Sequence, residues 1–318
     1  MNERRICGER KNTSEKKTLI NMPECGRVRR NTRITEIALL VTTLIWGNSF
    51  VAIKLLLNEM DPFSIAAVRF MVSAPFFLIF LWTKRGEWRI EKRDRWTFLL
   101  LGLMSVPMYH LPLNYGAQFI PAGTVSILIA LNPVFTALFA GIFLKEDIRG
   151  WKALGILMGF SGAVLIAVSG GKVEFYHILG VLIVIIAPLS WAFYTIISKP
   201  LLRRYNPIQL TSYITLIGGA MLFPFWPQAF SESIKLSLNG WLAMIYIGFI
   251  CVSLGYTVWY WALSRKEAYR TAIFVYFIPV SGLIGAYFIL GEVPHIIALV
   301  GGALILLGIW VVNRHDTQ

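Results

Sequence analysis

Long apolar runs, separated by short polar breaks, follow one another along almost the whole chain of 318 residues. Each run has ~20 residues, the length that a helix needs to cross ~30 Å of hydrocarbon. In lipid every backbone N–H and C=O group must find a partner within the protein, and a helix provides these partners locally. The pattern therefore predicts an all-α polytopic membrane protein without an inserted soluble domain. The ten predicted transmembrane helices cover residues 35–57, 63–83, 96–115, 121–144, 150–168, 178–198, 207–227, 239–262, 269–290 and 295–313.

The second half of the chain repeats the first. Segments 122–162 and 268–308 share nine of 41 positions at a spacing of 146, among them a proline and a lone glutamate. Four earlier residues recur at a spacing of 145. Such a repeat is the first guide to the architecture. The marker pairs are Pro133/Pro279, Glu146/Glu292, Trp46/Trp191, Lys54/Lys199, Pro62/Pro207 and Trp96/Trp241.

The two copies, residues 35–168 and 178–313, each hold five predicted helices. Because five is odd, the second copy must cross the membrane in the opposite sense from the first. We therefore expect a 5+5 inverted repeat, with Glu146 at the inner face and Glu292 at the outer face. Inverted repeats are typical of secondary transporters, in which a central site opens first to one side and then to the other.

The basic residues gather in alternate loops. With the N-terminus inside, 26 of the 30 Lys and Arg residues lie on the inner side and two on the outer side. This asymmetry predicts a multi-pass protein of the cell (inner or plasma) membrane with both termini cytoplasmic. Residues 1–33 hold ten of these bases and no apolar signal-peptide core, so a disordered cytoplasmic arm is expected. The net charge of +13 thus reflects orientation in the lipid bilayer and does not indicate a nucleic-acid partner.

The motifs of common enzymes and ATP-driven pumps are missing from the sequence. There is no Walker loop, no His-Glu-x-x-His and no Gly-x-Ser-x-Gly, and no Asp or Glu lies near the middle of a predicted helix. The three cysteines share no metal-ligand spacing. We therefore expect no catalysis, no cofactor and no metal. Exchange, facilitated diffusion and histidine-linked proton coupling remain as modes of transport.

Uncharged polar and aromatic residues near the centres of the runs are the candidates for a substrate pocket. Trp46 and Trp191 stand out because each falls about eleven residues into its run, too deep for the aromatic belt at a membrane interface. A cavity of this composition suits a small amphipathic solute with an apolar body. The predicted substrate-binding residues are Trp46, Asn48, Asn114, Ser126, Asn132, Trp191, Tyr194, Tyr260 and Tyr276.

Ionisable residues within apolar runs are costly and need a reason. Arg69 could bind an anionic group of the substrate, snorkel, or pair with Glu59 or Asp61 at the outer face, and we favour a gating or ion-pair role. Lys54 and Lys199 are repeat mates close enough to the ends of their helices to snorkel. His110 is the one proton carrier that the sequence offers at depth, and a neutral, hydrogen-bonded histidine is the alternative.

Prolines and glycines shape the predicted helices. Pro133 and Pro279 lie mid-span and are expected to kink the fourth and ninth helices around a cavity, or to be tolerated as static kinks. Small residues let helices approach closely in lipid. The glycines of segments 150–168 and 295–313 therefore predict contacts of the fifth and tenth helices, either between the halves or in a homodimer.

Residues 35–313 resemble the EamA-type permeases of the drug/metabolite transporter superfamily. The resemblance rests on Leu44-Ile45-Trp46-Gly47-Asn48-Ser49-Phe50, on Asn132-Pro133-Val134 with Leu144-Lys145-Glu146, and on Ile278-Pro279-Val280 with Leu290-Gly291-Glu292. It implies ten helices in an inverted repeat, a central cavity, an inner-membrane location and, often, export of amino acids, other metabolites or drugs. Ile214 stands where Arg69 would recur, so the arginine has no symmetric counterpart.

Two classes of function follow from these observations. The first is a secondary transporter that moves a small metabolite, an amino acid or a related amphipathic solute, by alternating access, with export favoured over import. Within this class a multidrug or lipophilic-cation exporter is the alternative. The second class, a membrane-embedded enzyme, would need a cluster of His, Asp or Glu at one face, and only His110 and His177 offer a start.

Overall fold

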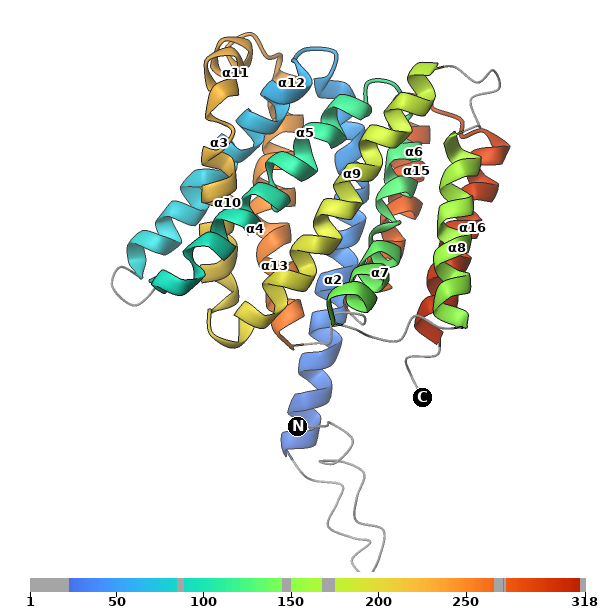
Figure 1. The fold of residues 1–318 in the computed structure, drawn as a ribbon. Helices are drawn as coiled ribbons and strands as arrows, with labels where there is room; N and C mark the ends of the chain where they lie inside the picture. Colours follow the sequence, from blue (N-terminus) through green and yellow to red (C-terminus); the bar gives the residue numbers. More distant parts are fainter. Residues whose placement is uncertain are drawn as a thin grey trace, which may run out of the picture.

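The computed structural model describes residues 23–84, 89–144, 150–167, 175–265, 271 and 273–314, and these residues form a bundle of helices without a β-strand among them (Figure 1). The helices of the first half are α2 (Pro23–Leu56), α3 (Pro62–Thr83), η2 (Lys92–Asp94), α4 (Arg95–Ser105), α5 (Pro107–Gly116), α6 (Ala122–Ile129), α7 (Asn132–Leu144) and α8 (Trp151–Ala167). Those of the second half are α9 (Phe175–Ser198), η3 (Lys199–Arg203), α10 (Pro207–Ala220), η4 (Phe223–Phe225), α11 (Trp226–Ser233), α12 (Leu238–Ile245), η5 (Tyr246–Leu254), α13 (Gly255–Arg265), η6 (Ile273–Tyr276), α15 (Phe277–Leu290) and α16 (Ile296–Arg314).

Each of the ten predicted ranges falls on one or more of these helices. Within the described residues, five helical segments are long and apolar enough to cross a membrane, or six if the bent pair of α10 with η4–α11 counts as one span. Shorter apolar helices account for the remaining ranges, because breaks divide some runs into pieces. The all-helical, multi-pass character that hydropathy predicts is therefore confirmed.

The breaks are a feature that hydropathy does not show. The predicted helix over 96–115 is divided at Val106 into α4 and α5, and that over 121–144 is divided between Ile129 and Asn132 into α6 and α7. Pro107 and Pro133 stand at the start of the second piece in each case, because proline lacks an N–H and clashes with the preceding helical turn. Pro133 thus follows an interruption of the helix and does not bend a continuous one.

The ninth predicted helix also has irregular backbone just before its proline. A 3₁₀ turn, η6, precedes α15, and Pro279 is the third residue of α15. The two repeat-related prolines are both buried and both follow directly on irregular backbone near the middle of the bundle. At the far end of α15, Gly291 has a φ of 68°, a left-handed conformation that glycine adopts without strain.

Three further features of the helices differ from the sequence prediction. Helix α2 begins at Pro23 and not at residue 35, so part of the predicted disordered arm is helical, whereas residues 1–22 lie outside the described part of the chain. Proline is favoured in the first turn of a helix, where its missing N–H costs nothing. The seventh predicted helix bends by 50° between α10 and η4–α11. Within the eighth, η5 is a π-helix.

The halves pack against each other in a symmetric set of contacts. Helix α8, the last of the first half, packs along α16, the last of the second half, and α3 packs along α10. Helix α2 packs against α15, just as its counterpart α9 packs against α6 and α7. Figure 1 shows α2 and α9 running in opposite directions, and the start of α2 at the same end of the bundle as the end of α16.

Glycines bring α8 and α16 together. A Cβ on Gly162 would lie 2.5 Å from the carbonyl oxygen of Gly301, and a Cβ on Gly308 would lie 2.6 Å from that of Gly155. In lipid, close backbone approach of this kind holds helices together through van der Waals contact. Of the two predicted roles for these glycines, the structure thus shows the contact between the halves.

Candidate functional site

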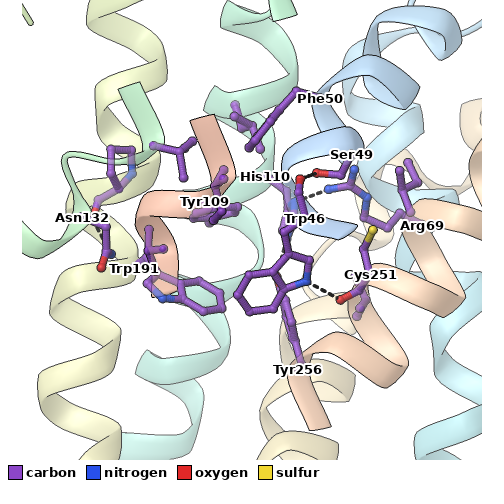
Figure 2. A pocket seen from close by; sticks show the side chains of 17 residues that line it. Trp46, Ser49, Phe50, Arg69, Tyr109, His110, Asn132, Trp191, Cys251 and Tyr256 are labelled. Carbon is purple, nitrogen blue, oxygen red and sulfur yellow. Dashed lines mark hydrogen bonds between the residues drawn. The ribbon is translucent and has the colours of Figure 1, made fainter. Parts of the chain in front are cut away.

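A narrow cavity lies near the centre of the bundle and is lined by both halves of the chain. Helices α2, α3 and α5 of the first half and α9, η5, α13 and α15 of the second contribute to its wall. Its volume of about 50 Å³ has room for a few water molecules. Figure 2 shows its lining side chains, which are predominantly aromatic and apolar.

Trp46 and Trp191 meet at the cavity. Their ring centroids are 6.1 Å apart in an edge-to-face arrangement, and Tyr256 lies against both, 5.9 Å from Trp46 and 5.3 Å from Trp191. Tyr109 also contacts Trp191, with ring centroids 5.3 Å apart. Such offset contacts are the favoured geometry for aromatic pairs. The cavity therefore has a rigid aromatic wall built from α2, α5, α9 and α13.

The π-helix η5 fixes the orientation of Trp46. The N–H of Gly255 donates to the carbonyl oxygens of Ile250 and Val252 and bypasses that of Cys251, its usual α-helical acceptor. The carbonyl of Cys251 accepts the indole N–H of Trp46 at 2.9 Å (Figure 2). Segments of π-helix inside α-helices are frequent at functional sites. Gly255 itself packs under the indole ring, because a Cβ there would lie 2.5 Å from Nε1 of Trp46.

Arg69 and His110 form a buried polar pair on the cavity wall. Nη1 of Arg69 lies 2.6 Å from Nδ1 of His110, and Nε2 of His110 lies 3.0 Å from the hydroxyl of Tyr256. Arginine has donors only, so Nδ1 must carry the lone pair that accepts this bond. His110 is therefore neutral here, with its proton on Nε2, from which it donates to Tyr256.

The guanidinium of Arg69 is only partly satisfied. The residue is 3% exposed, and its Nε and Nη2 atoms have no hydrogen-bond partner among the described residues. Within the described part of the chain no carboxylate forms an ion pair with it. The predicted partners are engaged elsewhere, since Asp61 caps the N-terminus of α3 and Glu59 accepts from Ser237. Arg69 neither snorkels nor pairs with an acid at the outer face.

Contacts across the cavity join equivalent positions of the repeat. Trp46 and Trp191 are 145 residues apart, and His110 and Tyr256 are 146 apart, the same spacings that relate the two halves in the sequence. Two equivalent residues can touch only where both halves approach one point. The cavity therefore lies where the halves meet.

Both repeats of this helical bundle match a family of known proteins. The model of the EamA-like transporter family matches this chain twice, over residues 33–168 and 178–314. The chain belongs to the EamA-like transporter family. The paired match also confirms the repeat and the family resemblance that the sequence indicates.

Relatives cover the EamA-like chain almost from end to end. A protein of Archaeoglobus fulgidus, named an uncharacterized transporter, is 34% identical over 87% of this chain and 98% of its own. A protein of Streptantibioticus cattleyicolor, named a probable terminal-alkyne amino-acid exporter, is 31% identical over 87% of this chain and 92% of its own. A crystal structure with 17% identity shares the fold, with a TM-score of 0.61 over 89% of this chain and 98% of that one.

The structure brings some of the predicted site residues of this EamA-like transporter together and leaves others apart. Those that line the cavity are Trp46, Asn132, Trp191, Arg69 and His110. Tyr194 and Tyr260 are fully buried behind this wall and pack edge to face at 5.8 Å, with Tyr194 against Trp191.

Three other predicted pocket residues lie in helix contacts away from the cavity. Asn114 donates to the carbonyl of Pro62, and Asn48 donates to the carbonyl of Leu44. Ser126 donates to the carbonyl of Gly123 and packs against Gly282 of α15. These side chains satisfy backbone groups, as polar residues at helix interfaces in membranes commonly do.

The remaining candidates lie toward the ends of the bundle or beyond the described residues. Lys54 is half-buried in the last turn of α2, and Lys199 begins η3. Glu292 accepts a long hydrogen bond of 3.4 Å from the N–H of Gly123, which links the end of α15 to the start of α6. Glu146 and the side chain of Tyr276 lie outside the part of the chain that the structure describes.

Sequence reasoning missed Tyr256, Cys251 and Tyr109 as members of the wall. Tyr256 could have been found, because it is the repeat mate of His110 and both halves contribute equivalent positions to the centre. Cys251 carries no such signal, since its role depends on its backbone carbonyl, which the N–H of Gly255 bypasses in the π-helix.

Proposed function

We propose that this EamA-like chain is a secondary transporter that exports a small metabolite, an amino acid or a related amphipathic solute, across the cell membrane. The observation that carries the proposal is the central cavity, whose aromatic wall is shared by both repeats and meets at Trp46 and Trp191. Apolar walls with a few polar groups are typical of small-molecule sites. The amino-acid exporter among the relatives supports this substrate class.

Ten crossings in a 5+5 inverted repeat, with both termini cytoplasmic, are part of this proposal. The opposite directions of α2 and α9 support the inversion, and the shared end of α2 and α16 supports an even number of crossings (Figure 1). The excess of Lys and Arg in alternate loops supports the orientation. A repeat of this kind allows the halves to exchange conformations around one site.

Polar clusters at both ends of the bundle support alternating access. At the end that holds η2 and η3, Asp94 accepts from Tyr205 at 2.6 Å and from Arg204 at 3.0 Å. Burial and the hydrogen bond to Asp94 raise the pKa of the Tyr205 hydroxyl, so it remains a donor at neutral pH. We call Asp94, Arg204 and Tyr205 the inner cluster, because it lies on the proposed cytoplasmic side.

An outer cluster joins equivalent regions at the other end. Glu59, after α2, accepts from the backbone and side chain of Ser237 at 2.8 and 2.7 Å, and Glu232 of α11 accepts from the N–H of Asp61 at 2.9 Å. Each cluster ties a segment of the first half to a segment of the second. Opening one while the other stays closed would expose the cavity to one side at a time.

Lipophilic cations fit this cavity less well than other solutes. Among the described residues that line the cavity, Arg69 is the one Asp, Glu, Lys or Arg, so this wall offers a positive charge and no carboxylate to a cation. Repulsion of like charges is strong in a medium of low dielectric constant. The charge of the wall therefore favours an amino acid or a related solute over the multidrug alternative.

The experiment is solute counterflow in proteoliposomes with a panel of radiolabelled amino acids, aliphatic and aromatic acids, and lipophilic cations. We expect saturable counterflow of an acid or amino acid, and its loss in Trp46→Ala and Trp191→Ala proteins that elute as wild type on size exclusion. Phe223→Ala, which shortens an exposed aromatic side chain outside the cavity, should leave the flux unchanged. Counterflow confined to cations, or flux that survives both tryptophan variants, would contradict the proposal.

A further inference from the structure

The unsatisfied donors of Arg69 form a matched pair. Nε–H and Nη2–H lie along one edge of the planar guanidinium, whereas the bond to His110 uses Nη1. Two parallel N–H groups at this edge match the two oxygens of a carboxylate in a bidentate pair. The edge of Arg69 that best suits a carboxylate is therefore the edge without a partner among the described residues.

The surroundings of Arg69 indicate that this edge binds an anion. Buried charges in membrane proteins pair with other groups or mark the path of a substrate. Arg69 is only 3% exposed, lines the cavity, and forms no ion pair with the described carboxylates. Its two free donors are closed to solvent in this conformation, so an anionic group would reach and neutralise Arg69 as the cavity opens.

We propose that Arg69 binds the carboxylate group of the transported solute, so that the site selects solutes with one carboxylate and an apolar body. This inference rests on the proposed transport function and names the group that the transporter recognises. The apolar body would lie against Trp46 and Trp191, which face the same cavity (Figure 2). One fixed positive charge in the lining matches one negative charge on the solute. A phosphate dianion can also pair with two N–H groups, but it would leave one negative charge unmatched in the cavity.

His110 is a positioning residue in this arrangement. As a neutral acceptor it holds Nη1 and leaves the Nε–Nη2 edge free, and Tyr256 in turn accepts from its Nε2–H. The titratable or charged groups around the pair are Tyr109 on α5, Tyr256 on α13 and Cys251 on η5, and none of these is a carboxylate. A neutral histidine does not compete with the solute for the positive charge, as an acid in its place would.

The test compares four solutes that share a phenyl body and differ in their charged group: 3-phenylpropionate, phenylalanine, phenylalaninamide and phenethylamine. Thermal unfolding of the purified full chain in detergent is followed with each solute and with inorganic phosphate. Ligands that bind the folded state raise the midpoint. We expect both carboxylates to raise it, and the amide, the amine and phosphate to leave it unchanged. Stabilisation by the amide or amine equal to that by the acids, or by phosphate alone, would overturn the proposal, as would failure of both acids.

Variants then test whether the binding of carboxylates depends on the guanidinium of Arg69. Arg69→Gln should weaken the apparent affinity for 3-phenylpropionate by about 30-fold or more, the range seen when one partner of a buried charged pair is removed. Arg69→Lys should recover part of this affinity, since lysine restores the positive charge but not the two parallel N–H groups. The matched control Lys235→Gln removes one positive charge at an exposed position and should bind as wild type. Wild-type affinity in Arg69→Gln would overturn the proposal.

Two further measurements are added. The first uses wild-type protein and so does not depend on whether an Arg69 variant folds, and the second tests whether His110 positions Arg69. In wild-type protein labelled with ¹⁵N-arginine, the buried Nε–H of Arg69 should shift with 3-phenylpropionate and not with the amide. His110→Ala should reduce discrimination between acid and amide. An unchanged ratio would remove the positioning role, and an unshifted Nε–H would overturn carboxylate binding.

Counterflow of the same four solutes separates this inference from the transport proposal. Flux of the acids that is lost in Arg69→Gln supports both. Arg69-dependent stabilisation without flux supports the carboxylate site and contradicts transport. Equal flux of acid, amide and amine supports transport and overturns the carboxylate site.

Discussion

Arg69, at the scale of single residues, shows what a sequence can and cannot reveal about a site. Its place inside an apolar run marks it as costly, and this much follows from hydropathy alone. That its partner is a neutral histidine 41 residues away, and not Glu59 or Asp61, depends on how α3 and α5 pack. Trp46 and Trp191, by contrast, can be paired from the sequence because the repeat assigns them equivalent places.

The bond between Arg69 and His110 leads to a prediction about stability. His110→Ala would remove the side-chain acceptor of Arg69 and leave a buried cation without a partner among the described residues. Breaking a buried charged contact from one side costs about 3–5 kcal/mol. We expect a fall of this order in the free energy of unfolding in detergent, measured by chemical denaturation.

His110→Gln provides the control for that prediction, because its side-chain oxygen can still accept from the guanidinium. It should lose less than half as much stability as His110→Ala. Equal losses in the two variants would show that the bond to Arg69 does not stabilise the fold.

Gly255 carries a second prediction at this scale. A Cβ would lie 2.5 Å from Nε1 of Trp46, so Gly255→Ala must displace the indole and break its 2.9 Å bond to the carbonyl of Cys251. Overpacking costs typically about 1–3 kcal/mol. We expect a raised KM for counterflow and a red-shifted tryptophan emission, because the displaced ring meets water in the cavity.

Gly219→Ala is the matched control, since a Cβ there would lie 3.2 Å from the Cβ of Phe70, away from the tryptophan. It should leave the emission spectrum unchanged. A wild-type KM and spectrum in Gly255→Ala would contradict the role assigned to the π-helix.

At the scale of elements, hydropathy located every apolar run but not its internal breaks. A window of apolar residues looks the same whether its backbone is α-helical, divided or π-helical, so the division at Val106 and the π-helix η5 carry no hydropathy signal. The prolines carried part of the information, because Pro133 and Pro279 recur at equivalent places. They predicted distortion correctly, but its form, an interrupted helix, depends on the packing of the folded chain.

The contact between α8 and α16 gives a prediction at the element scale. A Cβ on Gly162 would lie 2.5 Å from the backbone oxygen of Gly301, which cannot move aside without separating the helices. Gly162→Ala should therefore lower the unfolding midpoint in detergent, by a free energy of about 1–3 kcal/mol.

Gly302→Ala places the same added methyl group on α16, the partner helix of α8, against a softer neighbour. Its Cβ would meet the Ile127 side chain at 3.2 Å, and a side chain can adjust. This variant should unfold close to wild type. A smaller effect for Gly162→Ala than for Gly302→Ala would show that close backbone approach does not hold the two halves together.

At the scale of the whole molecule, the arithmetic of the repeat is the strongest guide. Spacings of 145 and 146 divide the sequence into two related halves, and the double family match confirms the duplication. The same spacings recur as contacts, Trp46 with Trp191 and His110 with Tyr256. The inner and outer clusters have no signature in the sequence, because each joins loops more than 100 residues apart.

The two clusters predict how the molecule opens. Asp94→Ala removes the acceptor shared by Arg204 and Tyr205, so it should favour the form open to the inside. Glu59→Ala removes the acceptor of Ser237 and should favour the form open to the outside. Cys251 lines the cavity and reports the change, in a protein whose Cys7 and Cys25 are replaced by serine.

A membrane-impermeant methanethiosulfonate reagent should modify Cys251 several-fold faster from the inside in Asp94→Ala and from the outside in Glu59→Ala. Arg93→Ala, at an exposed neighbour that forms an ion pair with Glu91, should leave both rates unchanged. The same change of rate from both sides in either variant would indicate general loosening and contradict a role as separate gates.

The most direct test of alternating access is the modification of Cys251 from each side of the membrane in turn. Right-side-out and inside-out vesicles that contain the protein with Cys251 as its single cysteine are treated with the impermeant reagent. We expect modification from both sides, at rates that a transported solute lowers, because one cavity opens alternately to each. Modification from one side alone, with or without solute, would contradict it.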